Sequence, residues 1–253
     1  MRTTLLLCML LGQWQIGQRS FAPTSNFKQG MVECWLGNDG SGNSFADGCG
    51  TGNTETLVAG SLTWATNAGL PGTTATFSST AYLKGINQTA TNFTGATPFS
   101  VSAWIILNGA GGATIISTLD PANNYVGWEF VAQYPGSNFL LHGFLINTYP
   151  SNAIEVGATN PVSTGTLHNV VMTYSAATKT AADVSFYLDG VLCTNAAPVE
   201  NSLTGSIANT KDATLGARTD GTSPINGVEA FIHIWNRQLS QADVTNYYTA
   251  GPK

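Results

Sequence analysis

Residues 99–107 have the sequence FSVSAWIIL, and this stretch decides the fold. Apolar residues occupy alternate positions in it: Phe99, Val101, Ala103 and Ile105. Alternation with a period of two predicts a β-strand rather than a helix. In antiparallel sheets such a strand buries one face and leaves the other in water. We therefore expect residues 99–107 to form one strand of a layered β-structure.

Nine further short runs are rich in β-branched and aromatic residues and are separated by Gly, Asn, Ser and Pro clusters, a pattern that predicts strands. They are Met31–Leu36, Ser61–Ala65, Ala81–Ile86, Thr114–Thr118, Val126–Ala132, Phe139–Ile146, His168–Tyr174, Asp183–Leu188 and Ala230–Trp235. Helices do not alternate with these strands, which excludes a parallel βαβ architecture. Asp189-Gly190 is predicted to form a two-residue hairpin turn, because Gly tolerates the positive φ of a type I′ turn.

A single helix is predicted near the C-terminus. Ser240 would cap its first turn, and Gly251-Pro252 would end it. Its apolar stripe would consist of Ala242, Val244, Tyr247 and Tyr248. The fold class is therefore all-β: a two-sheet antiparallel jelly-roll sandwich with a short C-terminal helix. We expect Trp104 and Trp235 to fill the core of this sandwich.

The composition limits the partners of the chain. Only 9% of its 253 residues are charged, and its net charge is −5. No cluster of Lys and Arg exists that could converge on a phosphate backbone, so nucleic acid is excluded as a partner. The surface must instead consist of Thr, Ser, Asn and Gly, a composition that suits extracellular β-proteins.

The chain divides into residues 1–30, a signal-like or tail segment, and residues 31–253, one sandwich domain. Arg2 precedes an apolar run over residues 5–11, and Ser20 and Ala22 place small residues before a cleavage point. The run is too short to span a bilayer. We expect a secreted or cell-surface protein. The alternative is a hydrophobic tail that packs on the domain or on a partner.

The four cysteines are Cys8, Cys34, Cys49 and Cys193. Cys8 lies within the signal-like segment. A Cys34–Cys49 disulfide is favoured because it would close a Gly-rich loop. The alternative is that the three remaining cysteines are small buried apolar residues. Zinc is disfavoured because the sequence contains no Cys-x-x-Cys motif.

Four segments, in order, resemble the laminin-G-like, concanavalin A-like lectin/glucanase family over residues 31–250. They are Cys34–Leu36 with the Gly- and Asp-rich loop up to Gly50, Phe99–Ile105, the pair Leu167–Tyr174 and Phe186–Leu192, and Leu215–Arg218 with the stretch from Asn226 to Ser240. The resemblance implies a jelly roll and a binding function. Ala230 and Phe231 stand where relatives often carry an acidic pair, which weakens the case for an inherited calcium site.

Catalysis is not expected. Hydrolysis of a glycosidic bond requires two carboxylates about 5–10 Å apart, and no two of the six Glu residues fall within one strand length. Signatures of serine hydrolases, metalloproteases and phosphate-binding loops are missing from the sequence. Glu129, in a strand rich in aromatic residues, is the one acid that we consider as a candidate catalytic group. We predict that the protein is not an enzyme.

Two candidate sites remain. Asp39, Asn43 and Asp47 offer oxygen donors in one loop and are candidate calcium ligands, although these residue types also build turns. A second group combines aromatic rings with amides and an acid, as sugar sites do. Its members are Tyr125, Trp128, Glu129, Tyr134, Asn147 and Tyr149.

These observations predict a surface binding module whose partner is a glycan or a surface protein, with no cofactor other than calcium. The alternative is a structural or adhesion component, such as part of an appendage or a virion surface. A glycoside hydrolase is the third hypothesis. The sequence leaves the oligomeric state open.

Overall fold

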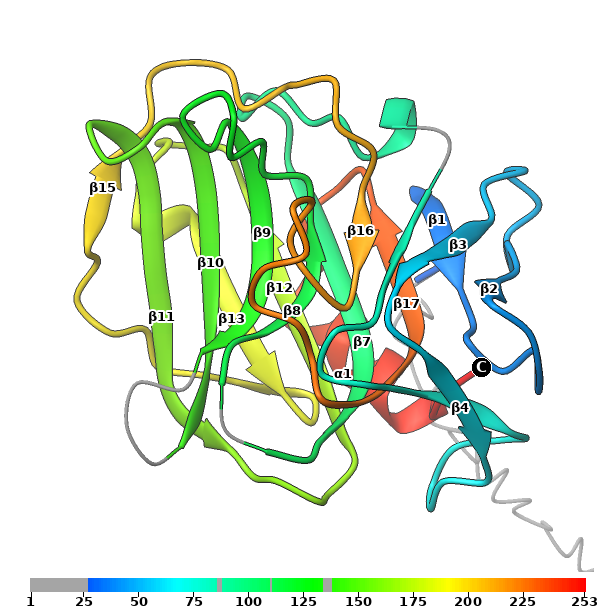
Figure 1. The fold of residues 1–253 in the computed structure, drawn as a ribbon. Helices are drawn as coiled ribbons and strands as arrows, with labels where there is room; N and C mark the ends of the chain where they lie inside the picture. Colours follow the sequence, from blue (N-terminus) through cyan, green and yellow to red (C-terminus); the bar gives the residue numbers. More distant parts are fainter. Residues whose placement is uncertain (1–26, 86–87, 110, 134–137) are drawn as a thin grey trace, which may run out of the picture.

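The computed structural model describes residues 27–85, 88–109, 111–133 and 138–253. Two antiparallel sheets lie face to face (Figure 1). The first sheet contains β1 (Met31–Trp35), β4 (Leu62–Ala65), β5 (Thr74–Phe77), β7 (Phe99–Leu107), β12 (His168–Tyr174), β13 (Val184–Leu188), β14 (Val191–Leu192) and β17 (Gly227–Trp235). Its strand order is β14-β13-β12-β7-β17-β5-β4, with β1 also paired to β17.

The second sheet has the order β15-β11-β10-β9-β8-β16-β6-β3-β2. Its strands are β2 (Ser44–Phe45), β3 (Glu55–Ala59), β6 (Tyr82–Lys84), β8 (Ala113–Ser117), β9 (Gly127–Gln133), β10 (Phe139–Thr148), β11 (Asn152–Val162), β15 (Glu200–Ser202) and β16 (Thr214–Leu215). Two 3₁₀ turns, Gln88–Ala90 and Ala181–Asp183, and the helix α1 (Gln241–Ala250) complete the described elements. No described helix is long and apolar enough to cross a membrane.

This architecture confirms the predicted two-sheet sandwich with a short C-terminal helix. All ten predicted strands have a counterpart, and residue 86 of one of them lies outside the described residues. The hairpin turn predicted at Asp189-Gly190 also forms, with φ of 51° and 79°. Two consecutive positive φ values are those of a type I′ turn. The Cys34–Cys49 disulfide forms, and Cys193 is a buried free thiol.

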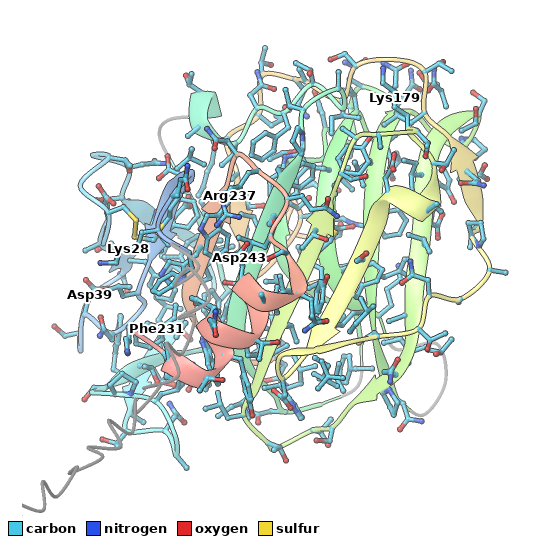
Figure 2. The ribbon with its side chains drawn as sticks, turned by 180° about the vertical axis from the view of Figure 1, so that it is seen from behind. Lys28, Asp39, Lys179, Phe231, Arg237 and Asp243 are labelled. Carbon is cyan, nitrogen blue, oxygen red and sulfur yellow. A yellow bond between two sulfur atoms is a disulfide. The ribbon has the colours of Figure 1, made fainter. Side chains whose placement is uncertain are left out.

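The main core lies between the sheets and contains the predicted face of β7: Phe99, Val101, Ala103 and Ile105. The expectation that the other face of β7 is solvated is wrong. Ser100 and Ser102 are fully buried there, and Trp104 is 6% exposed. Figure 2 shows why, because α1 lies across this outer face of the first sheet.

Trp104 and Trp235 are buried, but they do not fill the core between the sheets as predicted. Trp235 packs with Val244 and Tyr247 of α1, and Trp104 packs with residues that include Phe231 on the same outer face. The helix is held by a capping box in which Ser240 Oγ accepts from the Asp243 amide. Helix α1 and the residues packed beneath it therefore cover this part of the outer face of the first sheet.

Candidate functional site

The outer face of the second sheet carries a pocket of about 350 Å³. We call it the outer pocket. Its lining residues are Leu119, Tyr125, Gln133, Phe144, Ile146, Tyr149, Glu155 and Arg218. They come from β9, β10 and β11 and from three connecting segments. The floor is apolar because Leu119, Phe144 and Ile146 form a separate buried cluster on this face.

Two tyrosines stand at the rim of the outer pocket. The exposed fractions of Tyr125 and Tyr149 are 40% and 42%. Tyr125 and the preceding Asn124 both have positive φ, 59° and 50°, which is uncommon for non-glycine residues and marks a local backbone constraint. The Tyr149 amide donates to the Asn124 carbonyl. The two rim segments are thus linked, and both rings remain accessible to a ligand.

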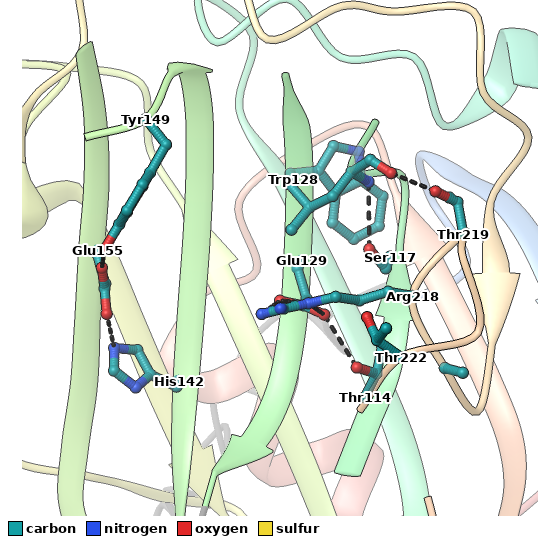
Figure 3. Close-up of polar contacts among 12 residues, drawn as sticks. Thr114, Ser117, Trp128, Glu129, His142, Tyr149, Glu155, Arg218, Thr219 and Thr222 are labelled. Carbon is teal, nitrogen blue, oxygen red and sulfur yellow. Dashed lines mark hydrogen bonds and ion pairs between the residues drawn. The ribbon is translucent and has the colours of Figure 1, made fainter. Parts of the chain in front are cut away.

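Arg218 and Glu129 form the polar centre beneath this rim (Figure 3). Arg218 donates from Nε to Glu129 Oε1 at 2.9 Å and from Nη2 to Oε2 at 2.8 Å, and Thr114 donates to Oε1. Glu129 is fully buried, whereas the Arg218 side chain is 22% exposed. The guanidinium carbon also lies 5.8 Å from the centre of the Phe144 ring. The pair is a charge-neutral, bidentate unit that fixes the guanidinium against the pocket floor.

A second polar group lies at the β10–β11 side of the pocket. Tyr149 donates its hydroxyl to Glu155 at 3.0 Å. Burial raises the pKa of Glu155, although the Tyr149 hydroxyl opposes this. Burial lowers the pKa of His142 to about 4, so the His142–Glu155 approach of 3.7 Å joins a neutral imidazole to the carboxyl group and is not an ion pair at neutral pH. Glu155 therefore offers a carboxylate oxygen on the pocket wall.

The structure brings together three of the six residues predicted for ligand binding. Tyr125 and Tyr149 line the outer pocket, and Glu129 holds Arg218 from below. Trp128 does not belong to this site: it is 1% exposed, lies in the core between the sheets, and donates its indole N–H to the Thr91 carbonyl. Successive residues of a strand face opposite sides, which places Glu129 outside and Trp128 inside.

Asn147 and Tyr134 complete the predicted set. The Asn147 amide donates to the Ser206 carbonyl at 2.7 Å, so it supports the neighbouring loop and is not among the lining residues of the outer pocket. Tyr134 lies outside the described residues.

Sequence reasoning missed Arg218, Phe144, Ile146, Gln133 and Glu155 as pocket residues. Glu155 lies in β11, a strand that was not predicted because Gly157 and Pro161 interrupt its pattern. Arg218 was noted only as part of a family segment. No local pattern marked it as a pocket residue, because the strand before it, β16, has only two residues and carries no periodic signal.

The predicted calcium ligands lie in the loop between β1 and β3. Asp47 accepts from the amides of Cys49, Gly50 and Gly52. Burial alone would raise the pKa of Asp47, but these amides outweigh it and lower the pKa. Asp39 accepts from the Ala46 amide at 3.3 Å. Both carboxylates thus build the turn, and Asn43 contributes its carbonyl to the Leu57 amide.

Among the described residues, one group of three metal-ligating side chains has all its ligand atoms within 4.8 Å of one another: Cys34, Asp47 and Cys49. The two sulfur atoms are joined in the disulfide and therefore supply no thiolate ligand. Calcium at Asp39, Asn43 and Asp47 stays a prediction.

Comparison with known proteins gives the fold a family. Residues 77–245, more than half of the chain, match the family described as "Concanavalin A-like lectin/glucanases superfamily". The comparison with curated protein sequences finds no match.

Solved structures with the same fold include domain 4 of AbnA, a GH43 extracellular arabinanase from Geobacillus stearothermophilus, in complex with arabinotriose. The identity is 16%, the TM-score is 0.60, and 85% of this chain and 97% of that chain are covered. The binding domain of Paraclostridial Mosquitocidal Protein 1 gives 12% identity and a TM-score of 0.63, with coverage of 88% and 53%.

The binding domain of Botulinum neurotoxin DC, solved in complex with SialylT, gives 15% identity and a TM-score of 0.57, with coverage of 88% and 52%. This chain therefore spans about half the length of the two toxin domains and nearly all of the arabinanase domain. At these identities the similarity concerns the fold. By the match over residues 77–245, the chain belongs to the concanavalin A-like lectin/glucanase superfamily.

Proposed function

We propose that this protein is a carbohydrate-binding module and that the outer pocket is its binding site. The observation that carries the proposal is that two exposed tyrosine rings line one pocket together with an apolar floor, Arg218 and Glu155. Sugar rings stack on aromatic faces, and a few convergent polar groups orient their hydroxyls.

The charges of the pocket favour a neutral sugar. Glu129 already neutralises Arg218 through two hydrogen bonds, so the guanidinium offers its remaining N–H groups as donors without a net positive field. Glu155 adds an acceptor. A sugar hydroxyl, which both donates and accepts, matches this pair of groups.

Family membership and the similar structures support a binding role. Two of the similar domains were solved in complex with a ligand, arabinotriose in one and SialylT in the other. We propose by extension that this chain is a non-catalytic module located outside the cytoplasm. The Cys34–Cys49 disulfide supports that location because such bonds persist in oxidising compartments.

The test is a glycan array followed by calorimetry with any neutral oligosaccharide that binds, in calcium and in chelator. Tyr125→Ala and Tyr149→Ala should each weaken binding about tenfold, the loss of one stacking contact. Tyr248→Ala is the matched control, since Tyr248 is 37% exposed but lies on α1 at the opposite outer face. An array without a neutral glycan ligand, or an equal loss in all three variants, contradicts the proposal.

A protein partner is the second candidate, and one observation favours it. Val191 and Leu192, on the edge strand β14, are 68% and 53% exposed beside Tyr248. Exposed apolar residues on a sheet edge are typical of protein contacts. Sedimentation analysis at high concentration, compared with a Val191→Lys variant, would detect self-association through this edge. A monomer at all concentrations argues against this role.

A further inference from the structure

Three glutamates point into the sandwich far from the outer pocket. Glu33 lies on β1 opposite Ile234, and Glu229 lies on β17 opposite Ile105. Both partners belong to the core between the sheets, and residues directly opposite on paired strands share a face. Glu55 comes from β3 of the second sheet. All three have no exposed surface, and we call them the interior carboxylate cluster.

The oxygens of this cluster lack partners among the described residues. Both oxygens of Glu55, both of Glu229, and Oε1 of Glu33 are buried without a hydrogen bond. Glu33 is the exception, because its second oxygen accepts from Thr51 at 2.9 Å and its carboxylate also hydrogen-bonds the Asn53 side chain. An unpaired buried carboxylate strongly destabilises the folded state, because burial removes its hydration and no hydrogen bond or counter-charge replaces it.

The ionised form of this cluster is unfavourable. Burial, and then the charge of a neighbouring cluster member, raise the pKa of Glu55 and Glu229 well above the ordinary value. Neither carboxylate receives a hydrogen bond from the described residues that would oppose this. The negative charge of the cluster must therefore be balanced by protons or by a cation from outside the chain.

The backbone nevertheless makes room for these carboxylates. A Cβ on Gly85 would lie 2.5 Å from Glu55 Oε1 and 3.2 Å from the side-chain oxygen of Asn53. Gly85 thus provides space for the Glu55 carboxylate beside an amide oxygen. Asn53 is held in place in turn, because its carbonyl accepts from the Trp35 indole at 2.7 Å. The result is a wall that presents oxygen atoms to the interior.

The chain itself supplies little compensating positive charge. Lys84, the cation that acts on Glu55, is half exposed and pairs with Asp212 at 3.3 Å. We propose that the interior carboxylate cluster binds a divalent cation, with Glu55 and Glu229 as charged ligands, Asn53 as an amide-oxygen ligand, and Glu33 adding negative charge beside them. Oxygen-only ligands of this kind select a hard cation, and flexible geometry favours calcium over magnesium.

The test begins with the purified full chain. After dialysis against metal-free buffer, elemental analysis by mass spectrometry should find one calcium ion per chain. Removing it with EGTA at elevated temperature should lower the melting temperature by about 5 °C or more, and calcium should restore it. A chain free of divalent metal, whose melting temperature calcium does not change, overturns the proposal.

Variants then locate the ion. Glu229→Gln and Glu55→Gln keep the side-chain size, remove one charge each, and should abolish both the calcium content and the response to EGTA. Asp39→Asn is the matched control in the surface loop and should retain both. If Asp39→Asn loses the ion while Glu229→Gln keeps it, the calcium belongs to the loop, and the interior site is refuted. Should the glutamine variants not fold, the elemental analysis of the unmodified chain still decides whether a cation is present.

Discussion

Glu129 and Glu229 are both fully buried glutamates on central strands of the same sandwich, yet their surroundings are opposite. Glu129 faces the outer pocket and receives hydrogen bonds from Arg218 and Thr114. Glu229 faces the space between the sheets, and neither of its oxygens has a partner among the described residues. The one carboxylate is satisfied by the chain, and the other requires something that the chain does not supply.

The difference shows that burial alone does not assign a role to a carboxylate. A buried carboxylate that meets a guanidinium with bidentate geometry forms a fixed structural unit with it. Buried like charges without a counter-charge are maintained only where a ligand or a proton stabilises them.

The largest effect is expected from breaking the outer pair. Arg218→Ala leaves the Glu129 charge buried and unpaired, and should lower the free energy of unfolding by about 3–5 kcal/mol. Urea titration measures this value. The double variant Arg218→Met with Glu129→Leu removes both charges and should recover most of the stability. A loss below about 1 kcal/mol for Arg218→Ala would show that Glu129 is not dependent on its partner.

The disulfide stabilises the segment that closes the interior cluster. It joins Cys34 to Cys49 across 15 residues, next to Thr51 and Asn53. Replacing both cysteines with alanine should cost about 3 kcal/mol, the value expected for a loop of this length. Reductant should cost the unmodified chain a similar amount and leave the double variant unchanged. A reductant effect on the double variant would assign the loss to another cause.

The pH dependence of unfolding tests the interior carboxylate cluster. Without a cation, the raised pKa values of Glu55 and Glu229 mean that the folded state keeps protons that the unfolded state has already lost. Stability in EGTA should therefore fall as the pH rises above about 4.5, by at least about 1 kcal/mol. With calcium bound, the ionised carboxylates are the stabilised form, so stability should rise and not fall as the pH increases through this range.

The informative quantity is the difference between the calcium and EGTA curves. Burial lowers the pKa of His142 and of His233 to about 4, so both destabilise the folded state as the pH falls from 6.5 towards 4. This contribution is the same in both buffers and cancels in the difference. Parallel curves would contradict the interior cation site.

The smallest effect is expected from the exposed ion pair near the cluster. Lys84→Ala removes a pair with Asp212 in which the Lys84 side chain is 48% exposed. Exposed pairs contribute about 1 kcal/mol or less. Urea unfolding of this variant with calcium present should show a loss within that range. A loss of several kcal/mol would identify Lys84 as the counter-charge of Glu55 and would remove the need for a metal ion.

Much of the fold followed from local patterns. The alternation in residues 99–107 predicted β7, Ser240 predicted the start of α1, and Asp189-Gly190 predicted a type I′ hairpin. Strands without clean alternation were missed. β11 was missed because Gly and Pro interrupt it, and β2 and β16 because two residues carry no periodic signal.

The candidate site was predicted less completely. Tyr125 and Tyr149 were found because aromatic residues beside amides are visible in the sequence. Arg218 lies 89 residues from Glu129, and no local pattern links two residues at that separation. The same limitation hid the interior carboxylate cluster, whose three glutamates come from three strands in two sheets.

The sequence by itself determined that the chain forms a two-sheet antiparallel sandwich, because strand periodicity, turn residues and a helix cap are properties of neighbouring residues. It also determined that Trp128 and Glu129 occupy opposite faces of β9, through strict alternation. Only the tertiary structure decided that Trp128 is in the core and Glu129 beneath a pocket, that α1 covers one outer face, and that Glu55 and Glu229 enter the same interior. Those outcomes depend on which strands become neighbours, and the pairing of distant strands is set by the packing of the whole domain.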